Sequence, residues 1–131
     1  MILDASAVIA ILRQEPEAAA FARAIENAPV TRISAANYVE AAIVIDSERN
    51  PIASRRVDEL LQRAEVEIAS VTPEQARLAR EAYRNFGRGS GHPAKLNFGD
   101  CFAYALAVTA GEPLLFKGDE FKKAGLKPPL E

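Results

Sequence analysis

Short apolar runs alternate with amphipathic stretches along the chain. The pattern predicts strands at 1–4, 30–33, 66–71 and 113–116, and helices at 5–12, 18–28, 34–49, 52–64, 72–86 and 99–110. Ser34 and Thr72 are suitable N-caps, and Gly111 is a suitable C-terminal residue for the last of these helices. Strands that alternate with helices predict an α/β fold, with a parallel sheet of four to five strands between two helical layers.

The length of 131 residues and a hydrophobic content of 49% fit one domain spanning 1–131 with a sizeable core. The segment 87–95 is rich in glycine and is expected to be the most mobile loop. The tail 127–129 contains two prolines and is expected to form at best an edge strand.

The composition limits the compartment and the metal chemistry. Cys101 has no second cysteine with which to form a disulfide or a zinc motif, and His92 is the only histidine. The apolar start of the chain lacks a basic segment, contains Asp4, and is too short to span a bilayer. We therefore expect a soluble, cytoplasmic protein with no membrane partner and no zinc site.

Four carboxylates stand out because they lie at the ends or on the apolar faces of separate elements. Asp4 ends the first strand, Glu40 has mostly apolar helical neighbours, Asp100 opens an apolar helix, and Asp119 follows the last strand. Ligands of open parallel sheets bind beyond the carboxyl ends of the strands, so these acids are expected to converge. Two unit charges about 4 Å apart interact by roughly 4 kcal/mol near a protein surface, so such a cluster needs a cation or protons.

Each acid also has a purely structural explanation. Asp4 can cap the first helix, Glu40 can reach solvent at a helix edge, and Asp119 suits a turn. Asn97 can cap the helix that contains Asp100, which would then complete a capping box. As a set, however, oxygen-only ligands suit Mg²⁺ or Mn²⁺, and either one or two ions could serve phosphodiester hydrolysis.

Several motifs together resemble one family. They are the opening MILDASAVIAIL, the segment from Ser34 to Glu40, and the later GHPAKLNFGDCFAYALA and EPLLFKGDEF. On these motifs the chain resembles PIN-domain ribonucleases, specifically VapC-type toxins of type II toxin–antitoxin systems, from residue 1 to about 121. The Asn97–Asp100 and Lys117–Asp119 segments are especially diagnostic.

The resemblance implies an acidic site and a reaction. Asp4, Glu40, Asp100 and Asp119 would be the catalytic acids and metal ligands, with Asp4 and Asp100 direct ligands and Ser6 a supporting hydroxyl. It also implies Mg²⁺- or Mn²⁺-dependent endonucleolytic cleavage of RNA, inhibition by a cognate VapB-type antitoxin whose C-terminal segment occupies the groove, and a homodimer.

Basic residues around the cleft are candidates for binding RNA. With the four acids set aside, the rest of the chain has more Lys and Arg than Asp and Glu. Arg88, Lys95 and Lys117 are the best placed to contact phosphates, although plain surface charge explains each as well. His92 is in the glycine-rich loop and is not needed as a base.

Four other classes of protein match parts of this pattern. A haloacid-dehalogenase-like phosphatase needs an acid at position 6, which is serine, and a receiver domain needs an acid after its third strand, where Ala69, Ser70 and Val71 lie. A catalytically inactive PIN-fold scaffold that binds RNA or protein would be expected to have lost an acid. A DNA nuclease stays open, because only substrate contacts separate the two backbones.

Overall fold

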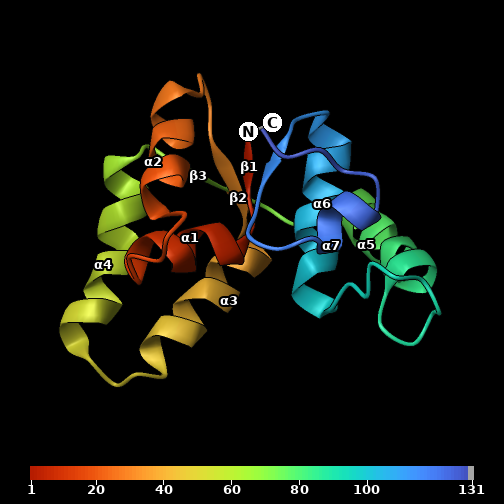
Figure 1. The fold of residues 1–131 in the computed structure, drawn as a ribbon, viewed down its shortest axis with the longest axis horizontal. Coiled ribbons are helices and arrows are strands. Elements are labelled where there is room, and N and C mark those ends of the chain that lie inside the picture. The colour runs from red at the N-terminus through yellow and green to blue at the C-terminus, as the bar shows by residue number, and fades with distance from the viewer. Residues whose placement is uncertain (130–131) are drawn as a thin grey trace.

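The computed structural model describes residues 1–129 and has a parallel sheet between two helical layers (Figure 1). The strands are β1 (Ile2–Leu3), β2 (Arg32–Ser34), β3 (Glu67–Ala69) and β4 (Leu114–Leu115), in the order β3-β2-β1-β4. Every pairing is parallel, with Ile2 opposite both Arg32 and Leu114. The predicted α/β/α class and the four-strand sheet are confirmed.

The helices follow the strands in chain order. They are α1 (Ala5–Leu12), α2 (Ala18–Asn27), α3 (Ala35–Asp46), α4 (Pro51–Arg63), α5 (Pro73–Phe86), α6 (Phe98–Ala110) and α7 (Glu120–Lys123). Helices α1 to α4 lie on one side of the sheet and α5 to α7 on the other (Figure 1). The connection from β1 to β2 therefore runs over one face of the sheet, and the connection from β3 to β4 runs over the other. The boundary between the neighbouring strands β1 and β4 is thus the switch point of the topology.

Alternation along the strands supplies two cores, one on each face. Ile2 and Leu114 join the core built on α5 and α6, whereas Leu3, Ile33 and Leu115 join the core built on α1 and α2. Residues two apart on a strand face the same way, so adjacent strand residues divide between the two cores. The sheet is thus buried on both faces, as a parallel sheet requires.

The predicted helix ends are confirmed where a side chain marks them. Ser34 caps α3, Thr72 caps α5, and Gly111 ends α6 in the left-handed conformation. The observed strands are shorter than predicted, and the expected strand at 30–33 begins two residues later, at Arg32. Residues 127–129 form no strand in the described part of the chain, and α7 was not predicted.

The glycine-rich segment is held by its own hydrogen bonds. An isolated parallel bridge joins Gly87 to Leu96, and the ring of Phe86 meets the ring of His92 edge-on at 4.9 Å. The Ser90 hydroxyl donates to the carbonyl of Gly87 (2.6 Å), and the N–H of Ala94 donates to Nδ1 of His92 (3.0 Å). His92 therefore acts as an acceptor that shapes this loop. No helix of the described chain has the length and apolar character needed to cross a membrane.

Candidate metal centre

Asp4 lies at the carboxyl end of β1, next to the switch point. It is buried, and its backbone N–H donates to the carbonyl of Leu115 in the neighbouring strand (3.0 Å). Its Oδ2 accepts a hydrogen bond from the N–H of Ser6 (3.0 Å), so Asp4 does cap α1. Its Oδ1 is buried and has no hydrogen-bond partner. Capping therefore engages one oxygen and leaves the other to a ligand, because a buried acceptor without a partner carries an energetic cost.

Asp100, like Asp4, uses one carboxylate oxygen to cap a helix. The N–H of Asp100 donates to Oδ1 of Asn97 (2.8 Å), and the N–H of Asn97 donates to Oδ2 of Asp100 (2.9 Å). This reciprocal pair is the capping box predicted for α6. The structural explanation for Asp100 is thus correct, and it does not compete with a metal-binding role for the remaining oxygen.

Glu40 is half-buried on α3 and faces the start of α6. The amide Nδ2 of Asn37 donates both to Oε1 of Glu40 (3.2 Å) and to the carbonyl of Gly99 (2.9 Å). A Cβ at position 99 would lie 1.9 Å from Oε2 of Glu40, so only glycine leaves room for this carboxylate. Asn37 is fully buried. It supports the site through these two hydrogen bonds, and it was not predicted from the sequence.

The fourth acid brought to this cluster is Glu120, in the first turn of α7. The negative charge of Glu120 raises the pKa of both Asp4 and Asp100. Glu120 and the predicted Asp119 are both exposed, and both line an adjoining hollow. Gly118, at φ 106°, adopts the left-handed conformation in the turn that precedes the two acids.

Burial and neighbouring charges raise the pKa of three of these carboxylates. Burial, more than any other cause, raises the pKa of Asp4, Glu40 and Asp100. The charges of Asp4, Glu40 and Glu120 contribute further to Asp100, whose pKa is raised to about 7 despite the hydrogen bond from Asn97. Such convergence of carboxylates is typical of sites that bind a cation.

The carboxylate side chains do not surround a common position for a metal ion. Among residues 1–129, no group of three or more His, Cys, Asp and Glu side chains is close enough to hold a metal ion. The donors nevertheless fit a hard divalent cation in type, because they are all carboxylates and Oδ1 of Asp4 is buried without a partner.

Ser6 and Lys117 connect the two halves of the site. The hydroxyl of Ser6 lowers the pKa of Asp4 and accepts a hydrogen bond from the backbone N–H of Lys117 (3.0 Å). The Lys117 ammonium lies 3.2 Å from Glu15 and 3.4 Å from Glu17. Its pKa is raised chiefly by the hydrogen bond to Glu15. Lys117 is therefore engaged by acids of the α1–α2 connection, whereas Arg88 and Lys95 line the hollow beside Asp119.

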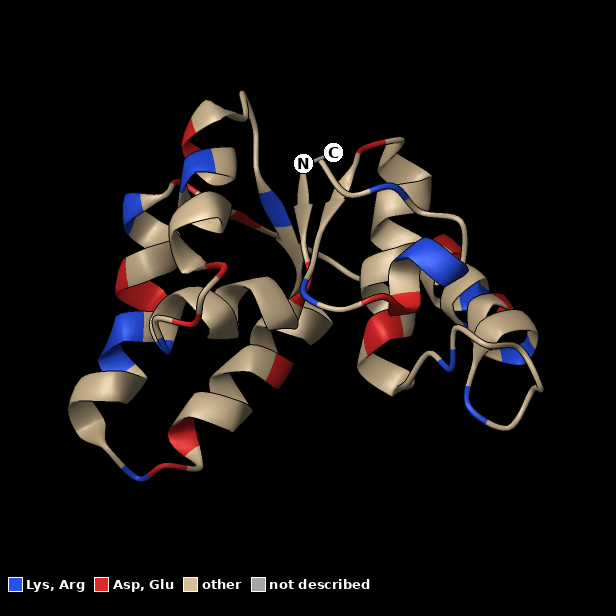
Figure 2. Cartoon of the chain, viewed as in Figure 1, with Lys and Arg blue, Asp and Glu red and all other residues tan. Residues whose placement is uncertain are grey.

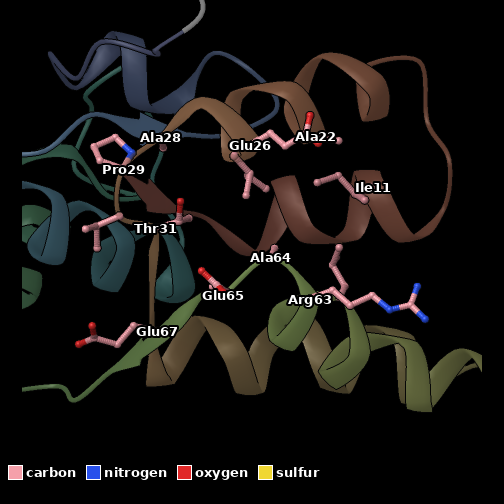
Figure 3. A pocket seen from close by; sticks show the side chains of 13 residues that line it. Ile11, Ala22, Glu26, Ala28, Pro29, Thr31, Arg63, Ala64, Glu65 and Glu67 are labelled. Carbon is pink, nitrogen blue, oxygen red and sulfur yellow. The ribbon is translucent and has the colours of Figure 1, made fainter.

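A second hollow lies at the opposite edge of the sheet. It has a volume of about 570 Å³ and is lined by residues that precede β2 and β3, including Pro29, Thr31 and Glu65 (Figure 3). None of the four predicted acids lines it. It is thus separate from the acidic site, because it lies where the strands begin.

The parallel sheet between two helical layers, with acidic side chains near the switch point, defines an α/β protein whose candidate site is built from carboxylates. The PIN domain family model matches residues 1–127. The chain belongs to the PIN-domain family and, within it, to the VapC ribonucleases. It is 58% identical to Ribonuclease VapC28 of Mycobacterium tuberculosis (strain ATCC 25618 / H37Rv) over 131 residues, which are 100% of this chain and 98% of the relative.

Two further similarities support this assignment. Ribonuclease VapC of Mycolicibacterium smegmatis is 48% identical over 122 residues, covering 93% of this chain and 94% of the relative. The crystal structure of Mycobacterium tuberculosis VapC20, described as a sarcin-ricin loop cleaving toxin, has a TM-score of 0.75 over 96% of this chain and 95% of that chain. Its sequence identity is 16%, so it supports the fold.

Proposed function

We propose that the protein is an endoribonuclease toxin that hydrolyses RNA phosphodiester bonds at the acidic cluster in the presence of Mg²⁺ or Mn²⁺. The observation that carries this proposal is the convergence of Asp4, Glu40, Asp100 and Glu120, with a buried oxygen of Asp4 left without a partner. The relatives named as ribonucleases support RNA as the substrate.

Asp4 and Asp100 would be the principal metal ligands, and Glu40 and Glu120 would act directly or through water. Asp119 stays a candidate because it lies beside Glu120. A bound divalent ion would supply charge to stabilise the phosphate oxygens and would make a water molecule more acidic. The chain's own residues hold the ligands in place: Asn37 orients Glu40, Asn97 orients Asp100, and Ser6 orients Asp4.

The partners proposed for the protein follow its family. We propose a cognate VapB-type antitoxin as the inhibitor, a homodimer, and a cytoplasmic location. Val39 and Ile43 on α3 are 50% and 62% exposed, which supports an apolar contact between protomers. Light scattering of the wild type and of Ile43→Asp tests the dimer, and loss of cleavage on adding a VapB-type protein from the same organism tests the inhibition.

The activity is tested with metal-stripped protein and a panel of structured RNAs and matched DNAs, with and without Mg²⁺ or Mn²⁺. A sarcin–ricin-loop hairpin belongs in the panel, because the structurally similar VapC20 is described as cleaving that loop. Metal-dependent cutting of RNA that is lost in a folded Asp100→Asn variant supports the proposal. Absence of cutting by a folded, metal-binding wild type on the whole panel favours either an RNA target outside the panel or an inactive scaffold.

The same assay separates the two neighbouring acids. We expect Glu120→Gln to lower the rate of cleavage by at least about tenfold, as for a group that completes or orients a metal shell. Asp119→Asn, one residue away and with the same loss of charge, is the matched control. A larger loss in Asp119→Asn than in Glu120→Gln would restore Asp119 as the fourth acid.

A further inference from the structure

A basic hollow adjoins the acidic cluster on the side of α7. It has a volume of about 530 Å³, and its lining includes Arg88, Lys95 and Lys123 together with Asp119 and Glu120. Glu120 also acts electrostatically on Asp4 and Asp100, so the hollow and the metal centre share one wall. Figure 2 places the basic segments of α7 and of the 87–96 loop on the same half of the molecule as the acidic segment of α6.

The loop that carries two of these cations is held by backbone hydrogen bonds. The N–H of Arg88 donates to the carbonyl of Leu96 (3.0 Å), and the N–H of Leu96 donates to the carbonyl of Phe86 (2.9 Å). Arg88 and Lys95 therefore lie on facing segments, each one residue from the bridged pair. Lys95 has φ 50°, in the left-handed region that a non-glycine residue rarely adopts and that is often maintained at functional sites.

The cations of this hollow differ from those across the site. Arg13 is paired with Glu48, and Lys117 is paired with Glu15 and Glu17. By contrast, Arg88, Lys95 and Lys123 make no ion pair with any of residues 1–129. These three unpaired cations lie beside Asp119 and Glu120, where they can attract a polyanion that the acids themselves would repel.

We propose that this hollow binds a backbone phosphate of the RNA next to the one that is cleaved, with Arg88, Lys95 and Lys123 as its cationic wall. The inference rests on the proposed nuclease function. Contacts to phosphate supply much of the affinity of RNA-binding proteins and fix the register of the strand without reading its sequence. Because the three cations line one hollow beside Asp119 and Glu120, they would also fix the direction in which the strand leaves the acidic cluster.

The test measures binding separately from cleavage. In an Asp100→Asn background without metal, fluorescence anisotropy follows a labelled RNA hairpin of roughly 20 nucleotides over a range of salt concentrations. The variant replaces the three cations of the hollow with alanine. The matched control replaces three exposed cations on α2 and α4, Arg23, Arg55 and Arg56, and so removes the same charge.

We expect the hollow variant to bind at least about tenfold more weakly near 0.1 M salt, and its dependence of log Kd on log salt to fall by about 1 per cation lost. The control should keep most of the parent's affinity. A DNA hairpin of the same sequence should lose affinity by a similar factor, because the contact is to phosphate. An RNA-specific loss would instead indicate a contact to the 2′-OH and would overturn the phosphate assignment.

Failure of this inference is distinguishable from failure of the proposed function. If the hollow variant and the control have the same Kd and salt dependence, the inference is wrong even when the wild type cleaves RNA. If the hollow variant loses binding but the wild type cleaves nothing on the panel, the nuclease proposal fails while the phosphate site stands. In an active enzyme, the three substitutions should raise KM more than they lower kcat.

Discussion

Removing one charge from the acidic cluster should stabilise the metal-free protein while abolishing its activity. The pKa of Asp100 is raised from 3.8 to about 7, so the folded state disfavours its ionised form. A shift of this size corresponds to about 4 kcal/mol for a fully buried group. Since Asp100 is only partly buried and solvent screens its charge, we expect about 1–2 kcal/mol.

The dependence on pH follows from the direction of the shift. Between about pH 4 and pH 7 the folded state binds more protons at Asp100 than the unfolded state does, so stability falls as pH rises through this window and levels off above it. Asp100→Asn removes this penalty and keeps the acceptor for the N–H of Asn97. Its advantage should therefore be full near pH 8 and should be mostly lost near pH 5.

Thermal unfolding in a metal chelator measures this effect. At about pH 8 we expect the melting temperature of Asp100→Asn to exceed that of the wild type by about 4–8 °C. Glu59→Gln, an exposed position on α4, is the control for loss of one negative charge and should change it little. Excess Mg²⁺ or Mn²⁺ should stabilise the wild type, by about 2.7 kcal/mol at a hundred times Kd, but not the variant. A folded variant that is less stable than the wild type at both pH values would refute the reasoning.

Three further substitutions test the supports of the site. Gly99→Ala places a methyl group against Glu40. Displacement of that carboxylate should reduce the rate of cleavage by about 100-fold and should lower the free energy of unfolding by about 1–3 kcal/mol, with both quantities measured in parallel with those of Asp100→Asn. Ser6→Ala removes a hydroxyl that lowers the pKa of Asp4 and accepts a hydrogen bond from the N–H of Lys117, so Mn²⁺ affinity measured by calorimetry should fall by about tenfold. His92→Ala removes the acceptor that shapes the 87–96 loop; RNA affinity should fall severalfold, while an unchanged affinity would mean that the loop keeps its shape without the imidazole.

Capping residues made the starts of the helices predictable from the sequence. The ends of the strands were harder to predict, because they depend on pairing with other strands. Ser34, Thr72 and Asn97 announce helix starts through side-chain chemistry that acts within three residues. The limits of a strand depend instead on its partner. Val30 was expected in a strand, but its carbonyl binds the ammonium group of Met1 (2.8 Å), so regular pairing begins only at Arg32. Helix α7 has four residues, too few to establish a periodic pattern.

The identity of the fourth acid shows where reasoning from sequence reaches its limit. Asp119 and Glu120 are adjacent, and consecutive residues at a helix start point in directions about 100° apart. The sequence therefore located the acidic turn. In the fold the charge of Glu120 acts on Asp4 and Asp100, and the choice between the two neighbouring acids stays a prediction that the Asp119 and Glu120 variants test. Asn37 was missed for a related reason, because its hydrogen bond to the carbonyl of Gly99 joins α3 to α6, which is far away in the sequence.

The structural and functional explanations of the acids turn out to be parts of one arrangement. Asp4 and Asp100 each use one carboxylate oxygen to hold a helix start, which fixes the direction of the side chain without consuming its second oxygen. A helix N-terminus also favours the ionised form, so each cap partly offsets the burial and mutual repulsion that raise the pKa. The caps therefore keep two repelling carboxylates rigidly in place, and what remains unfavourable in the metal-free protein is what binding of a divalent cation would relieve.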